Sequence, residues 1–223
     1  RHFRTGSLFS HRKFSNTHWG SGEFKLQKTG VLTFHQYEPH RYIVLDQNYN
    51  QTDTLTCKNG YITDAHELVL LPNGHSLFIC LDPQIVDMSE IVTGGRTDAV
   101  VIGNHVQELD SNGNVCFEWR SWDYYDIEDA VHENLTGSHI DYVHMNSIAV
   151  DYDGNLIISS RNLSEITKIN RETKEILWRL GGENNWFDFI GDTTEISYQH
   201  HARPAPGTPG HYTIFDNGNH RYP

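Results

Sequence analysis

The sequence has few of the residues that mark helical, metal-binding or membrane proteins. Its 223 residues include three Cys and two Met, and it has no long stretch rich in Leu, Ala, Glu and Lys. No two Cys have the Cys-X-X-Cys spacing of zinc and redox sites. No apolar run approaches the roughly 18 residues that cross a membrane as a helix. These absences argue against a helical bundle, a Cys-X-X-Cys centre and a membrane span.

Positive charge is also scarce. The formal net charge is −12, which argues against nucleic acid or an anionic membrane surface as a partner. A small anionic substrate would need a local positive pocket inside this acidic shell. Among the Cys, Cys80 ends an apolar run over residues 77–80, so we interpret it as a buried free thiol. A disulfide with Cys57 is the alternative.

Short β-type runs with turn signals between them make up most of the chain. Aromatic residues account for 12% and hydrophobic residues for 37% of the sequence, a balance typical of β structure. We expect an irregular N-terminal segment over 1–29 and one β domain over 30–223. The expected strands cover residues 31–37, 42–45, 52–57, 67–71, 76–80, 100–109, 114–119, 146–150, 156–159, 166–169, 175–180 and 211–215.

The hairpins group into repeated four-stranded units. One unit spans about 64–121, the next 142–182, and a third begins near 198, with loop-rich insertions at 82–98, 122–140 and 183–197. Repeated antiparallel units of this kind predict an all-β fold, the β-propeller. The sequence holds strands for three to four blades, whereas a propeller closes with about four to eight. We therefore expect further C-terminal blades outside it.

A His stands near the entry of each unit. His66, His144 and His200 hold this position, and the first strand of a propeller blade lines the axial channel. The three imidazoles are therefore expected to meet near the axis. Arg161 follows the second strand of the middle unit, and Asn146 lies beside His144.

These residue types suit the transfer of a tetrahedral anionic group. Arg offers a planar fork of donors that matches such an oxyanion. A neutral imidazole can attack sulfur or phosphorus, and a second imidazole can protonate the leaving oxygen. Within 144–146 and 199–201 there is no Asp or Glu to repel the anion. The pattern predicts sulfuryl or phosphoryl transfer.

Other residues near these segments receive structural interpretations. Glu67 should point away from the channel because side chains alternate along a strand. The aromatic group Trp119, Trp122, Tyr124 and Tyr125 is expected to pack between blades, with an aryl pocket as the alternative. His132 and His139 belong to a long insertion that could reach the channel mouth.

Several stretches resemble the bacterial arylsulfate sulfotransferase family. They are DAHELVLLPNG at 64–74, DYVHMNS at 141–147, ISSR at 158–161, ILWRLGG at 176–182, SYQH at 197–200 and FDNGN at 215–219. The resemblance implies a six-bladed propeller and a ping-pong reaction, without a nucleotide sulfate donor, from an aryl sulfate to a phenol. It implies that His200 becomes sulfated, with His201 as the open alternative. His66, His144, Asn146 and Arg161 would hold the sulfuryl group, one His acting as acid and base.

The resemblance carries further expectations. It implies a periplasmic or secreted protein that uses no cofactor and no metal, has small-molecule partners only, and for which a homodimer is left open. The family's disulfide near the active site has no counterpart here, because no Cys pair lies between residues 117 and 223. Two other functions stay open. One is a metal-dependent propeller lyase or hydrolase that uses the three His and Gln199 as ligands, and the other is a non-catalytic module that binds sulfate esters.

Overall fold

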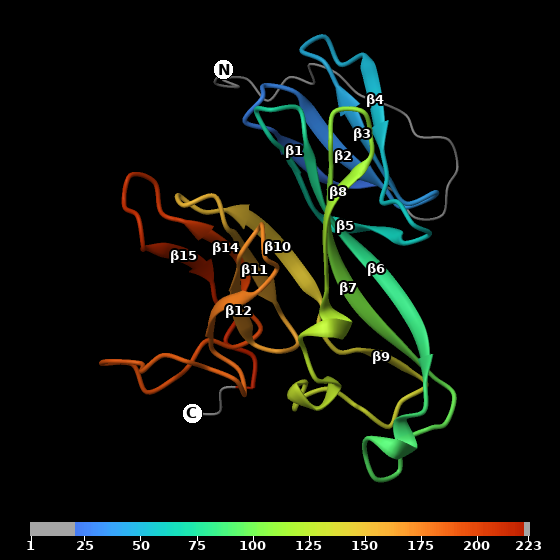
Figure 1. Cartoon of the computed structure of the whole chain (residues 1–223), viewed down its shortest axis with the longest axis vertical. Coiled ribbons are helices and arrows are strands. Elements are labelled where there is room, and N and C mark those ends of the chain that lie inside the picture. The colour runs from blue at the N-terminus through green and yellow to red at the C-terminus, as the bar shows by residue number, and fades with distance from the viewer. Residues whose placement is uncertain (1–20, 221–223) are drawn as a thin grey trace, which may run out of the picture.

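Four antiparallel sheets follow one another along the chain in the computed structural model, which describes residues 21–220 (Figure 1). In each sheet the spatial order of the main strands equals their order in the sequence. The first sheet contains β1 (Ser21–Leu26), β2 (Leu32–Gln36), β3 (Arg41–Leu45) and β4 (Gln51–Leu55).

The second sheet is the largest. It contains β5 (Ile62–Leu70), β6 (Ser76–Val86), β7 (Ala99–Leu109) and β8 (Val115–Arg120), and β9 (His139–Asp141) pairs in parallel with β7. The third sheet contains β10 (Met145–Val150), β11 (Leu156–Ser160), β12 (Glu165–Ile169) and β13 (Ile176–Leu180). The last contains β14 (His200–Pro204) and β15 (Tyr212–Phe215).

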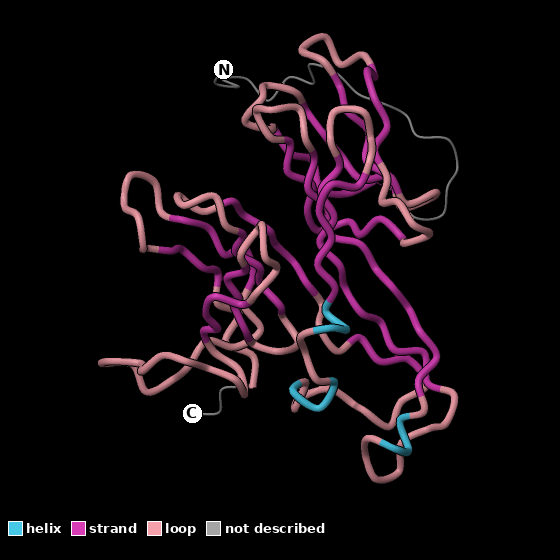
Figure 2. Tube along the Cα trace, in the orientation of Figure 1, coloured by secondary structure: helices cyan, strands magenta, loops and turns pink. Residues whose placement is uncertain are grey.

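Helical structure in the described residues is limited to three single turns (Figure 2). These are η1 (Met88–Glu90), η2 (Ser121–Asp123) and η3 (Ile127–Asp129). No helix between residues 21 and 220 is long and apolar enough to cross a membrane.

Local turn chemistry explains why the hairpins form where the sequence predicts them. In the β7–β8 turn, Asp110 Oδ1 accepts hydrogen bonds from the backbone N–H groups of Asn112 and Asn114, both at 2.8 Å. Gly113 then takes a φ of +80°, which glycine adopts without steric cost. These bonds satisfy the backbone at the turn and set the strand register.

The prediction of an all-β propeller fold is confirmed: the described residues form two four-stranded sheets, a five-stranded sheet in which β9 joins β5–β8, and a two-stranded sheet. The expected bounds of two irregular segments, 1–29 and 82–98, need correction. Strand β1 lies inside the segment 1–29, which we expected to be irregular, and residues 1–20 lie outside the described residues. The pairing of β6 with β7 also continues through Val86 and Ala99, into the insertion at 82–98.

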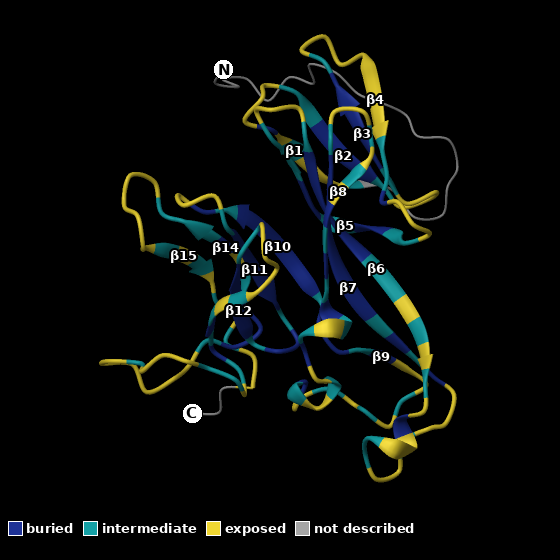
Figure 3. Ribbon diagram, in the orientation of Figure 1, coloured by how far each residue is buried: buried dark blue, intermediate teal, exposed yellow. Residues whose placement is uncertain are grey.

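The blades pack through aromatic and aliphatic side chains. Trp119 stacks on Tyr124 with ring centroids 4.7 Å apart, and it meets Tyr125 edge to face. Its Nε1–H donates to the carbonyl of Lys174 in the β12–β13 turn, at 3.1 Å. The expected packing of these aromatics between blades is therefore what the structure shows. Figure 3 shows that the buried residues concentrate in the strands nearest the junction of the sheets.

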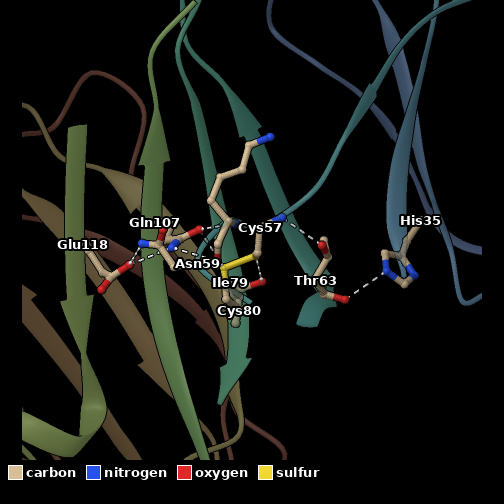
Figure 4. Close-up of a disulfide and its surroundings, with 9 residues drawn as sticks. His35, Cys57, Asn59, Thr63, Ile79, Cys80, Gln107 and Glu118 are labelled. Carbon is tan, nitrogen blue, oxygen red and sulfur yellow. Dashed lines mark hydrogen bonds between the residues drawn. A yellow bond between two sulfur atoms is a disulfide. The ribbon is translucent and has the colours of Figure 1, made fainter. Parts of the chain in front are cut away.

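A disulfide joins Cys57, between β4 and β5, to Cys80 of β6 (Figure 4). Our interpretation of Cys80 as a free thiol was wrong, because the β4–β5 connection returns beside β6 and brings the two Cα atoms to 6.1 Å. Cys57 N–H also donates to Thr63 Oγ1 at 2.9 Å, which fixes this connection. Cys116 is free.

Candidate active site

Three His from three successive sheets meet where the inner strands converge. His66 lies in β5, His144 directly precedes β10, and His200 begins β14. Strand β10 packs against both β5 and β14, and Figure 1 shows β10 beside β14. The rings of His66 and His144 meet edge to face, with centroids 4.9 Å apart. Residues distant in sequence thus share one site.

Two of these imidazoles are held by Asp residues. His66 Nδ1 lies 2.8 Å from Asp64 Oδ1, and His144 Nδ1 lies 2.6 Å from Asp141 Oδ2. Each carboxylate also accepts the backbone N–H of its own His. The hydrogen bond to Asp64 raises the pKa of His66, against the opposing effect of burial. His66 is therefore biased toward the imidazolium form.

His200 has the opposite environment. Its Nδ1 lies 3.1 Å from the carbonyl oxygen of Tyr198. A carbonyl can only accept, so Nδ1 carries the proton of the neutral ring and Nε2 keeps its lone pair. Burial lowers the pKa of His200, and the positive charges of His144, His66 and Arg161 lower it further. His200 therefore lies within electrostatic range of the other two His and of Arg161.

Arg161 is fixed at the end of β11. Its guanidinium carbon lies 4.2 Å from the centre of the Tyr198 ring, a cation–π geometry. One terminal nitrogen donates to Asn162 Oδ1 at 2.7 Å. The Tyr198 hydroxyl in turn donates to Glu133. Arg161 is thus held in one orientation beside the segment that carries His200.

Asn146 and Gln199 tie β14 to the third sheet. Asn146 Nδ2 donates to the Gln199 carbonyl at 2.8 Å, and its Oδ1 accepts the His201 N–H at 3.4 Å. Gln199 is fully buried, and its Nε2 donates to Ser159 Oγ and to the carbonyls of Ser160 and Glu165. Its amide nitrogen therefore turns into the sheet.

His201 lies apart from the three His. It is exposed and adopts a φ of +57°, and its charged neighbours are Arg203, Glu67 and Lys25. A register irregularity in β14 between His200 and Arg203 accompanies this change of direction. Of the two adjacent His, His200 is the one that the charges of the site surround.

Glu67 departs from the expectation that it points away from the channel. It is 1% exposed, and it forms ion pairs with Lys25 of β1 and Arg203 of β14. These partners belong to the first and last sheets, so Glu67 faces inward between them. The reason is the register irregularity of β5 between Thr63 and Leu68, which resets the alternation of side chains.

Sequence reasoning missed Asp64 and Asp141: segments 144–146 and 199–201 hold no Asp or Glu, as noted, but these two carboxylates outside them lie beside His66 and His144. The signal was present, because Asp64 stands two residues before His66 and Asp141 three residues before His144. Of the insertion residues, His132 reaches the edge of the site, with its ring 6.2 Å from that of Tyr198. His139 lies in β9 and is exposed.

The backbone at the site takes conformations that L-residues rarely adopt. His144 has a φ of +50° and Tyr198 a φ of +54°. Such conformations cost on the order of 1 kcal/mol or more each, and they collect at functional sites.

The fold is that of a β-propeller protein, and His66 and His144, from adjacent sheets, contact each other where its sheets come together. The sequence matches the arylsulfotransferase (ASST) family over residues 7–222, and the chain belongs to this family. No curated protein sequence matches it.

Solved structures with some likeness were also found. A protein of unknown function from Bacteroides caccae has 13% identity and a TM-score of 0.40, over 85% of this chain and 68% of that one. A streptogramin B lyase has 13% identity and a TM-score of 0.41, over 82% of this chain and 44% of the lyase. Virginiamycin B lyase from Staphylococcus aureus has 10% identity and a TM-score of 0.40, over 84% of this chain and 61% of the lyase. The chain thus spans less than two thirds of either lyase.

Proposed function

We propose that this protein transfers a sulfuryl group from an aryl sulfate to a phenol in two steps, through a sulfated His200. One observation carries the proposal. The carbonyl-bound His200 has a lowered pKa and a free Nε2 lone pair, while the Asp64-bound His66, which acts on it electrostatically, has a raised pKa. Two similar groups whose pKa values are pushed apart can divide the roles of nucleophile and acid.

In the first step, His200 Nε2 attacks the sulfur of the aryl sulfate. A nitrogen–sulfur bond forms while the bond from sulfur to the aryl oxygen breaks, and its electron pair leaves on that oxygen. The imidazolium of His66 gives its proton to the departing oxygen, which leaves as a phenol.

The second step reverses these roles on a new acceptor. Neutral His66 takes the proton of the acceptor phenol, and the phenol oxygen attacks the sulfur. The nitrogen–sulfur bond breaks, and its electron pair returns to Nε2 of His200. The products are a new aryl sulfate and the enzyme in its starting protonation state.

The remaining residues support this reaction. Arg161 would neutralise the sulfuryl oxygens with its fixed guanidinium, and His144 would donate a further hydrogen bond to them. Asn146 would hold His200 in place through its two bonds to the β14 backbone. A direct bond from Asn146 to the sulfuryl group stays a prediction, as does any role for His201.

The metal-dependent alternative has less support. Gln199, one of its expected ligands, directs its amide nitrogen into the third sheet. In residues 21–220, the one group of His, Cys, Asp or Glu whose ligand atoms converge lies elsewhere, at His75, Glu108 and Cys116.

We infer a periplasmic or secreted location from the disulfide. Disulfides such as Cys57–Cys80 form and persist in oxidising compartments and are rare in reducing ones. Retention of this bond in protein recovered from its native host, measured by thiol alkylation and mass spectrometry, tests the inference. Recovery of the reduced form only would contradict it.

The test of the reaction uses p-nitrophenyl sulfate with and without phenol, and follows the release of nitrophenol. We expect release that depends on phenol and disappears in His200→Ala but persists in His201→Ala. Release without phenol would indicate a hydrolase. Absence of release in the folded wild-type protein, with retained binding of the ester, would favour the non-catalytic module.

A further inference from the structure

A second group of reactive side chains lies outside the channel, at one end of the second sheet. His75 belongs to the β5–β6 turn, Glu108 is the penultimate residue of β7, and Cys116 is the second residue of β8. Ser76 pairs with Leu109, and Glu108 pairs with Phe117. This register places the three residues at neighbouring positions on adjacent strands.

Their donor atoms converge. His75 Nδ1 lies 2.6 Å from Glu108 Oε1 and 3.8 Å from Cys116 Sγ. All three donor atoms lie within 4.8 Å of one another. Within the part of the chain that the structure describes, no other group of this kind occurs. We propose that His75, Glu108 and Cys116 bind one divalent transition-metal ion, with zinc as the best match.

The donor set explains the choice of metal. Thiolate and imidazole favour zinc over magnesium or calcium, which prefer oxygen ligands. Tetrahedral zinc with nitrogen, oxygen and sulfur ligands needs donor separations of roughly 3.3 to 3.8 Å. The His75–Cys116 distance of 3.8 Å already meets this value, whereas Glu108 Oε1, at 2.6 Å from His75 Nδ1, has to move away from that nitrogen for both to bind the ion. The Cys116 proton passes to solvent on binding, and water fills the fourth position.

Arg171 shapes the site from the next sheet. It lies in the β12–β13 turn, and its Nε donates to Glu108 Oε2 at 2.8 Å, while another nitrogen donates to Oε1. Its positive charge opposes a cation, yet it also orients the carboxylate, as outer residues around metal ligands do. The two negative ligands offset this charge. A bound ion would thereby connect the second sheet, through Glu108 and Arg171, to the third.

Cobalt titration of the full chain tests the proposal, because a Co²⁺–thiolate bond produces a near-ultraviolet charge-transfer band. Cys57 and Cys80 are bonded to each other and the sequence has three Cys, so such a band in the oxidised protein reports on Cys116 alone. We expect one equivalent of Co²⁺ to saturate the band and Zn²⁺ to abolish it. Cys116→Ser should lose the band.

Two further variants locate the ion. His75→Ala should weaken Co²⁺ binding by more than about tenfold, since even residues that only support metal ligands contribute roughly 10- to 100-fold in affinity. His144→Ala, in the channel, should leave the band unchanged. Absence of a thiolate band in the folded wild-type protein would overturn the proposal. A Co²⁺ affinity of His75→Ala equal to that of the wild-type protein would also overturn it. The Co²⁺ band is measured without any sulfate ester. Failure of metal binding can therefore be told apart from failure of the proposed sulfuryl transfer.

Discussion

The imidazole of His66 meets that of His144 edge to face, with ring centroids 4.9 Å apart. Two adjacent imidazoles that both carry a proton repel each other, and each is backed by its own carboxylate, Asp64 or Asp141. The Asp64 carboxylate raises the pKa of His66, so His66 can keep a positive charge where an anionic group would bind. His200, which lacks such a partner among its hydrogen bonds, stays neutral beside them.

Asp64→Asn should narrow the pH range of activity. Asp64 raises the pKa of His66, so His66 keeps its proton to higher pH than an ordinary imidazole does. Without the carboxylate, that proton is lost at lower pH, and the alkaline limb of the kcat–pH profile should move toward lower pH. Phenyl sulfate is the appropriate donor, because its poor leaving group depends on an acid. Asp98→Asn, at an exposed position, is the control, and equal profiles for the two variants would contradict the assignment.

Arg161→Gln should lower the rate and also shift the acid limb. Removal of one oxyanion donor typically costs about 100- to 1,000-fold in kcat. Loss of the Arg161 charge removes one of the causes that lower the pKa of His200, so the acid limb should move to higher pH. Arg161→Lys keeps the charge but loses the planar fork. Arg161→Lys should therefore lower kcat with little change in the acid limb of the kcat–pH profile. An acid limb that moves equally in Arg161→Gln and Arg161→Lys would contradict the view that the charge of Arg161 lowers the pKa of His200.

Glu67→Gln should destabilise the protein. The buried carboxylate of Glu67 joins Lys25 and Arg203, which belong to the first and last sheets. Hydrogen bonds to charged groups contribute about 1.5 to 3 kcal/mol each, and the partners here are partly exposed. We expect a loss of about 2 kcal/mol in the free energy of unfolding, measured by urea denaturation. Glu128→Gln, in the η3 turn, is the matched control, and an unchanged midpoint in Glu67→Gln would mean that the ion pairs add no net stability.

Removal of the Cys57–Cys80 disulfide should lower the free energy of unfolding by more than Glu67→Gln does. The Cys57–Cys80 bond closes a loop with a sequence separation of 23, and cross-links of this size stabilise by about 3 kcal/mol through restriction of the unfolded chain. The double variant Cys57→Ser, Cys80→Ser should show this loss in urea denaturation. Cys116→Ser, which leaves the bond intact, should match the wild-type protein in the absence of added metal. Equal stability of all three proteins would contradict the prediction.

The sequence by itself determined the β architecture, and it predicted which His would come together. Hairpins could be predicted because turn residues such as Asp110 and Gly113 act on their immediate neighbours, and because alternation along a strand is a local property. The convergence of His66, His144 and His200 could be predicted from their repeated position, because equivalent positions in successive blades lie at the same distance from the axis.

Tertiary structure decided the rest. The irregularity in β5 turned Glu67 inward, and the path of the β4–β5 connection brought Cys57 to Cys80. The protonation preferences of His66 and His200 followed from a carboxylate on one side and a carbonyl on the other. None of these could be predicted from spacing alone, because each depends on a contact or a bulge that is settled only when separate segments pack together. Local patterns specify which elements form, whereas the charge and orientation of a side chain depend on its neighbours in space.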